Sequence, residues 1–277
     1  MRIIKSLLVI GLFFLTLFAA EENPFRKITS YEEAFITYRR AARLDDIEEK
    51  MKLFDKVLEF YFSQDPINYD RVGIVYRMKC ITFLDKDKFN EFNNVLNEFQ
   101  KSLPEKFEYI IKGMKIRENL QLRNLDEVIR LANKYIKEYP NKRLGYYMKG
   151  YALFLKEKYK KANETFDFIL EKENDVNLLL YKGISEIENK KYDKGLKNIA
   201  FYISNSKLMP NSLPYYYKAI AYFHLGDYEK AKENIIKGRK INSVDLVELS
   251  DRNDTLFKEK VEKEIDEIEK KMQQKVD

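Results

Sequence analysis

Residues that could carry catalysis or bind a metal are few in this sequence of 277 residues. It contains one histidine, His224, and one cysteine, Cys80. A multi-histidine metal centre or a nucleophile–base pair needs several such groups, and no serine or cysteine motif surrounds His224. We therefore expect His224 on the surface or in a groove, with a catalytic role as the alternative. The sequence predicts no catalytic site, no metal and no cofactor.

Two further kinds of site are disfavoured. No GxGxxG or GK[ST] loop is present, so nucleotide phosphates have no backbone cradle. The formal net charge is +6, and lysine and glutamate are interleaved along the chain instead of forming a basic stripe, which argues against nucleic acid as a partner. Acidic pairs such as Glu262 and Glu264 lie among lysines, as on a solvated helix face.

Composition indicates the elements that must position any site. Charged residues make up 35% of the chain, with 9 glycines and 6 prolines. Many charges with few helix-breaking residues favour long amphipathic helices. The prolines fall where helices are expected to end, at positions 24, 66, 104, 140, 210 and 214.

An internal repeat arranges these helices. Segments such as YYMKGYALFLKEKY (146–159) and YYYKAIAYFHLGDY (215–228) align with three others. Each segment has a small residue, spaced 33 to 37 residues from the next: Cys80, Gly113, Gly150, Gly183 and Ala219. A tyrosine column (Tyr159, Tyr192, Tyr228) and a second column containing Ala162 and Ala231 follow. Cys80 thus takes a buried small apolar role, with an intermolecular disulfide as the alternative.

Each copy is predicted to fold as two helices joined by a short turn. Small residues let the two helices approach closely, and the tyrosine fills the gap near the turn. One pair cannot bury its apolar face alone, so neighbouring pairs stack. The expected repeats are 73–105, 106–142, 143–175, 176–211 and 212–243.

These columns resemble the tetratricopeptide repeat family, in its exported bacterial type. The resemblance implies an all-α fold: a right-handed α-solenoid of antiparallel helix pairs whose first helices line a concave groove that binds a protein or peptide. The implied groove residues are Arg77, Ile110, Met114, Tyr147, Tyr151, Phe154, Leu180, Ile184, Tyr216, Ile220, Phe223 and His224.

A column of lysines departs from the family pattern, which usually has leucine there. Its members are Lys79, Lys112, Lys149, Lys182 and Lys218. The column is interpreted as lysines whose stems pack on apolar neighbours, with a cationic ladder for acidic peptides as the alternative.

The segments on either side of the repeats are also expected to be helical. Residues 21–70 form a degenerate helix pair, beginning at Ser30 with Glu33 completing a capping box. Residues 244–277 form a charged capping helix with an apolar stripe of Leu256, Phe257, Val261, Ile265, Ile268 and Met272; a coiled-coil or docking helix is the alternative.

The first twenty residues resemble a secretory signal. Arg2 and Lys5 precede an uncharged apolar run ending at Ala20. An uncleaved membrane anchor is the main alternative, and a cytoplasmic chain the other. The segment predicts export to the periplasm or cell envelope, with membrane contact only through this segment if it is uncleaved.

The functional hypothesis is a non-catalytic scaffold of the cell envelope that binds protein partners in the solenoid groove. The alternative is a membrane-anchored periplasmic accessory factor in protein translocation or outer-membrane assembly. An enzyme is the third hypothesis.

The signal prediction has a direct test. Sequencing the N-terminus of the protein purified from cells should give a start near Glu21, because signal peptidases cut where an apolar run ends. A start at Met1 would instead support the anchor.

Overall fold

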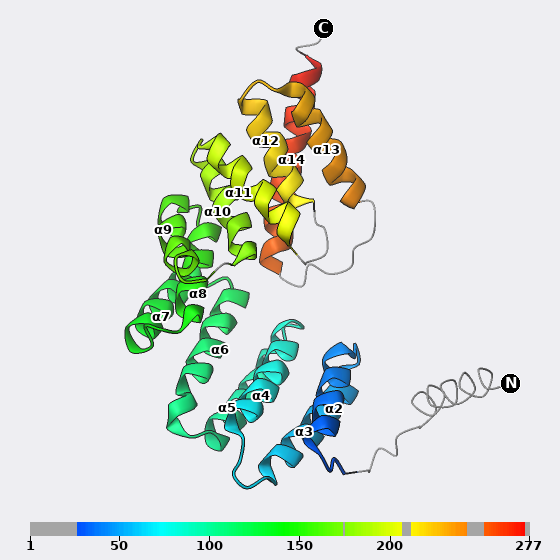
Figure 1. Ribbon diagram of the computed structural model, residues 1–277, viewed down its shortest axis with the longest axis vertical. Coiled ribbons are helices and arrows are strands. Elements are labelled where there is room, and N and C mark those ends of the chain that lie inside the picture. The colour runs from blue at the N-terminus through cyan, green and yellow to red at the C-terminus, as the bar shows by residue number, and fades with distance from the viewer. Residues whose placement is uncertain (1–26, 174, 207–211, 243–251, 275–277) are drawn as a thin grey trace, which may run out of the picture. The chain divides into compact units, whose positions relative to one another are not determined.

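The computed structural model describes residues 27–173, 175–206, 212–242 and 252–274 (Figure 1). These residues contain thirteen α-helices, one short 3-10 helix and no strand, so the all-α prediction is confirmed. The predicted signal at 1–20 lies outside them. The chain divides into two compact units, residues up to Val75 and residues from Tyr76 on, each described by itself.

The first unit is built on a helix pair, α2 (Tyr31–Arg43) and α3 (Ile47–Phe62). The Ser30 hydroxyl caps α2 by accepting a hydrogen bond from the backbone N–H of Glu33 at 3.2 Å. Asp46 caps α3 in the same way at Glu49, at 2.7 Å. The two helices enclose a small core that includes Ala34, Ala41 and Phe54, all fully buried.

Helix pairs continue along the chain through the second unit. α4 (Tyr69–Leu84) starts before the predicted repeat boundary at residue 73, because the side chain of Asn68 accepts a hydrogen bond from the backbone N–H of Arg71. The other elements are α5 (Phe89–Ser102), the 3-10 helix η1 (Glu105–Phe107), α6 (Glu108–Gln121), α7 (Leu125–Glu138), α8 (Arg143–Leu155), α9 (Tyr159–Leu170), α10 (Val176–Glu188), α11 (Tyr192–Asn205), α12 (Leu213–His224), α13 (Tyr228–Asn242) and α14 (Arg252–Gln273).

The turns inside the five repeats share one backbone geometry. Each contains one residue with positive φ: Asp87, Arg123, Glu157, Lys190 or Gly226. The next residue donates its backbone N–H to the carbonyl five positions earlier, as Lys158 does to Leu153 at 2.9 Å. This is the Schellman arrangement, which satisfies carbonyls at the end of a helix. Four of the five turns adopt it without glycine.

The small residues lie where the paired helices meet. Gly183 of α10 and Gly195 of α11 face each other so closely that a Cβ on Gly195 would lie 2.7 Å from the Gly183 carbonyl oxygen. A Cβ on Gly150 would lie 2.7 Å from Cδ1 of Phe166. Cys80, Ala162, Ala219 and Ala231 are fully buried. Gly113 differs, because its nearest contact is Leu144 of the next repeat.

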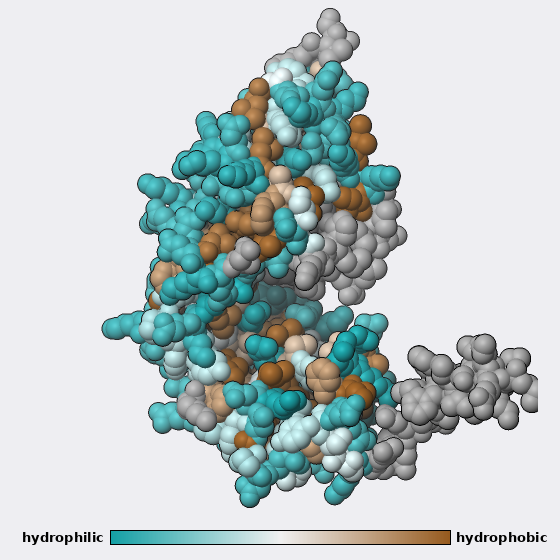
Figure 2. Space-filling model, viewed as in Figure 1, coloured by the Kyte–Doolittle hydropathy of each residue, from teal (hydrophilic) through white to brown (hydrophobic). Residues whose placement is uncertain are grey.

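The tyrosine column is less uniform than the small residues. Tyr159 is buried, Tyr192 is half-buried and Tyr228 is exposed at the last turn. On the face shown in Figure 2, hydrophilic side chains dominate and hydrophobic patches lie between them.

Gly150 gives a test of this packing. Gly150→Leu should lower the free energy of unfolding by about 1–3 kcal/mol or more, because the new side chain meets the buried Phe166 ring. Denaturant unfolding measures this loss, and Phe166→Ala in the same chain should recover part of it. Ala200→Leu, at an exposed position of α11, is the control. Equal losses at both sites would contradict the assigned helix contact.

Candidate functional site

The twelve predicted groove residues differ in accessibility. Arg77 and His224 are exposed, and Ile110, Tyr147 and Phe223 are half-buried. The remaining seven are buried: Met114, Tyr151, Phe154, Leu180, Ile184, Tyr216 and Ile220. Most of the expected lining is therefore core in this structure, and a partner reaches those seven side chains only if the packing changes.

One repeat position shows where the face is open. Arg77, Ile110 and Tyr147 each lie three residues before the small residue of their repeat, and all three side chains are at least partly accessible. Leu180 and Tyr216 occupy the same position in the last two repeats and are 7% and 2% exposed. We call this position, in all five repeats, the inner-face position. It is open in the first three repeats and closed in the last two.

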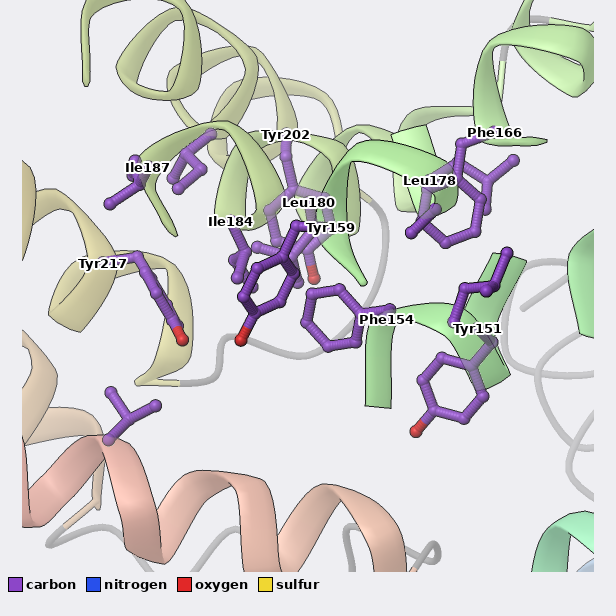
Figure 3. Packing of buried hydrophobic residues seen from close by; sticks show 14 of the residues in the cluster. Tyr151, Phe154, Tyr159, Phe166, Leu178, Leu180, Ile184, Ile187, Tyr202 and Tyr217 are labelled. Carbon is purple, nitrogen blue, oxygen red and sulfur yellow. The ribbon is translucent and has the colours of Figure 1, made fainter. Parts of the chain in front are cut away.

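The C-terminal helix α14 packs against this closed region. Val261, Ile265 and Ile268 are at most 2% exposed and join the same apolar cluster as Phe154 and Tyr217. The Tyr159 and Tyr217 side chains extend towards the side on which α14 lies (Figure 3). The residues Val261, Ile265 and Ile268 have i, i+4, i+7 spacing, which places them on one face of the helix. The stripe members Leu256 and Phe257 lie outside the described side chains.

Ion pairs fix α14 at two separate places. Arg239 of α13 donates a hydrogen bond to Asp266 at 2.8 Å and also pairs with Glu269. Lys260 pairs with Glu157 in the turn between α8 and α9. α14 therefore reaches from the fifth repeat back to the third.

Polar side chains of α14 and of the repeats also lie in the contact between them. The Tyr217 hydroxyl donates a hydrogen bond to Glu188 at 2.9 Å. Burial, reinforced by the negative charge of Glu188, raises the pKa of the Glu264 carboxyl. The Tyr159 hydroxyl is buried and has no hydrogen-bond partner among the described residues. These groups oppose the docking that the apolar residues favour.

Two lysines of the column form ion pairs with residues of second helices. Lys112 contacts Glu138 at 2.7 Å, and its ammonium lies over the Tyr139 ring at 5.4 Å. Lys182 of α10 pairs with Asp167 of α9. Lys79 is only 5% exposed, beside the Tyr76 ring. This geometry favours packed stems over a cationic ladder.

His224 and Cys80 are the two side chains considered for catalysis in the sequence. The His224 ring stacks on that of Tyr192 with 5.2 Å between centroids, and burial with nearby Lys190 and Lys271 lowers the pKa of the imidazole. Burial raises the pKa of the Cys80 thiol to about 12, which makes it a poor nucleophile at neutral pH.

The described part of the chain lacks two features, a metal-binding group and a membrane-spanning helix. It contains no group of three or more His, Cys, Asp or Glu side chains that could hold a metal. None of its helices is both long and apolar enough to cross a membrane.

Glu264 gives a pH-dependent test of α14 docking. Because its folded-state pKa is raised, the stability it contributes is complete below the ordinary value of 4.5 and is lost as the pH rises through the raised pKa. Glu264→Gln should therefore raise the free energy of unfolding at pH 7, with the gain shrinking towards pH 4. Thermal melts from pH 4 to 8 measure it. Glu259→Gln, at an exposed position of α14, is the control; the same gain there would argue against desolvation of the half-buried Glu264.

Comparison with known proteins places this architecture. No family model matches the sequence. A TPR repeat-containing protein of Methanocaldococcus jannaschii is 25% identical over 238 residues, covering 81% of this chain and 39% of that protein. The chain thus spans about two fifths of the length of that relative.

Two solved structures are similar at low identity. MamA from Desulfovibrio magneticus matches with a TM-score of 0.51 and 16% identity, over 63% of this chain and 97% of its own. PilF from Pseudomonas aeruginosa matches with a TM-score of 0.54 and 11% identity, over 77% and 95%. At these identities the likeness shows the fold alone. Taken with the stacked hairpins, the comparisons confirm the resemblance to the tetratricopeptide repeat family: the chain has the fold of a tetratricopeptide repeat protein.

Proposed function

We propose that this chain is a non-catalytic scaffold that binds protein or peptide partners along the first helices of its repeats. The observation that carries the proposal is the open inner-face position in the first three repeats. Ile110 of α6 and Tyr147 of α8 are half-buried there, and Arg77 of α4 is exposed. Partly accessible apolar and aromatic side chains next to an exposed arginine are typical of a polypeptide-binding surface.

Two features of the described residues suit binding better than catalysis. The lone histidine stacks on a tyrosine instead of meeting a nucleophile, and the lone thiol is buried. The repeats instead supply equivalent positions at regular intervals, so a partner segment can contact several helices at once.

We also propose that the scaffold works outside the cytoplasm, in the periplasm or cell envelope. The support is the charged start and apolar run of residues 1–20. If that segment stays attached, the chain would be a membrane-anchored accessory factor in protein translocation or outer-membrane assembly.

Binding at the open positions is tested with a matched pair of variants. Ile110→Asp with Tyr147→Ala should reduce partner recovery from a cross-linked envelope extract by roughly tenfold, because both side chains contact the partner. The control is Ile236→Asp on α13, where an isoleucine is 58% exposed away from the inner-face position. Circular dichroism checks that each variant stays helical. Partner recovery that falls equally for the two isoleucine sites, or for neither, would argue against this face.

A further inference from the structure

The arrangement of α14 resembles that of a ligand helix in a receptor. Its three buried apolar residues, Val261, Ile265 and Ile268, insert into the apolar cluster of the last three repeats. Burial, followed by the negative charges of Glu262, Asp266 and Glu269 of α14, raises the pKa of Tyr216, the closed inner-face residue of the fifth repeat. Segments far apart in sequence thus meet: Lys260 and Glu157, which form an ion pair, are 103 residues apart.

Several features make this contact suited to exchange. The ion pairs at both ends are solvent-exposed: the side chains of Lys260 and Glu157 are 54% and 59% exposed, and that of Arg239 is 48%. Exposed pairs of this kind add little stability. In between, the Glu264 carboxyl is desolvated near the like-charged Glu188, and the buried Tyr159 hydroxyl lacks a partner among the described residues.

The connection between α13 and α14 sets the strength of the internal competition. Ten residue steps separate Asn242 from Arg252, so an extended connection reaches at most about 36 Å. Because α14 and its contact face belong to one chain, α14 competes for that face intramolecularly. A free helix of the same chemistry must overcome that advantage to bind.

We propose that the face under α14, on repeats three to five, is a docking site for an amphipathic helix of a partner protein that carries a carboxylate pair facing Arg239, and that α14 is the resident helix which such a partner displaces. This inference rests on the proposed scaffold function and names the partner chemistry for the closed part of the face. The expected sequence pattern of the partner helix is that of α14. It has apolar side chains at i, i+4 and i+7, where i is Val261, and carboxylates at i+5 and i+8 that pair with Arg239.

The partner is a different protein and not a second copy, because every copy carries its own tethered α14. Exchange of α14 between two copies replaces each contact with an identical one and gains none. A partner helix that has no such groove of its own displaces α14 by mass action.

The test separates α14 from its tether without changing a contact residue. A protease site is introduced within residues 243–251 of the full chain, and a fluorescent peptide of residues 252–273 is added before and after cleavage. Fluorescence anisotropy should show binding to the cleaved chain roughly tenfold tighter or more than to the intact chain, because cleavage removes the tethered competitor. A peptide carrying Ile265→Asp should not bind.

A charge exchange tests the chemistry of the site. Arg239→Glu in the cleaved chain should weaken binding of the native peptide by at least about threefold and restore it for a peptide with Asp266→Lys and Glu269→Lys. Arg130→Glu is the control, since Arg130 pairs with Glu127 on α7 instead. An effect of both substitutions on the native peptide would overturn the assignment.

Three other results would overturn the proposal. Equal peptide binding before and after cleavage would mean that α14 does not occupy the site. Dimerisation of the cleaved chain without peptide uptake, seen by light scattering, would identify a second copy as the occupant. Loss of the melting transition on cleavage would make α14 an integral part of the fold. None of these results bears on partner recovery through Ile110 and Tyr147, so the scaffold function is judged separately.

Discussion

The close approach of paired helices is the constraint on which the rest of the structure depends. Gly183 and Gly195 bring the backbones of α10 and α11 into contact, and Gly150 leaves room for the Phe166 ring. Without a Cβ at these points the apolar faces interdigitate, and each pair presents a regular surface to the next. Stacking then buries side chains from three helices at once, so the first helices of the repeats are held rigidly in a row.

Where the row ends, apolar surface must be covered, and α14 covers it at an electrostatic cost. Val261, Ile265 and Ile268 lose their solvent exposure, while Glu264 is desolvated near Glu188. Burial of the apolar side chains stabilises the docking of α14, whereas desolvation of the carboxylate opposes it. Around Ile110 and Tyr147 the side chains stay half-buried, so among the described residues this part of the face is more accessible than the part at Tyr216.

The repeat turns show how local backbone chemistry supports this arrangement. Lys158, Lys191 and Asp227 each donate a backbone hydrogen bond to the carbonyl five residues earlier. Those bonds hold Glu157 and Lys190 in the left-handed region, which costs an ordinary residue about 1–2 kcal/mol. Gly226 allows one of these turns to be predicted from the sequence. The other four have no glycine at the positive-φ position, so the sequence does not predict their geometry.

The sequence by itself determined the helix pairs, because the columns of small and aromatic residues recur every 33 to 37 residues and helix periodicity assigns each to a face. Accessibility of the candidate site was decided only by the tertiary structure. Tyr147 and Tyr216 are the same residue at the same repeat position, yet one is half-buried and the other is 2% exposed. The Tyr216 ring packs against Gly238 of α13 and belongs to the apolar cluster that α14 joins, and α14 also places Lys260 on a residue 103 positions away. A local pattern carries no information about a neighbour so distant in the chain.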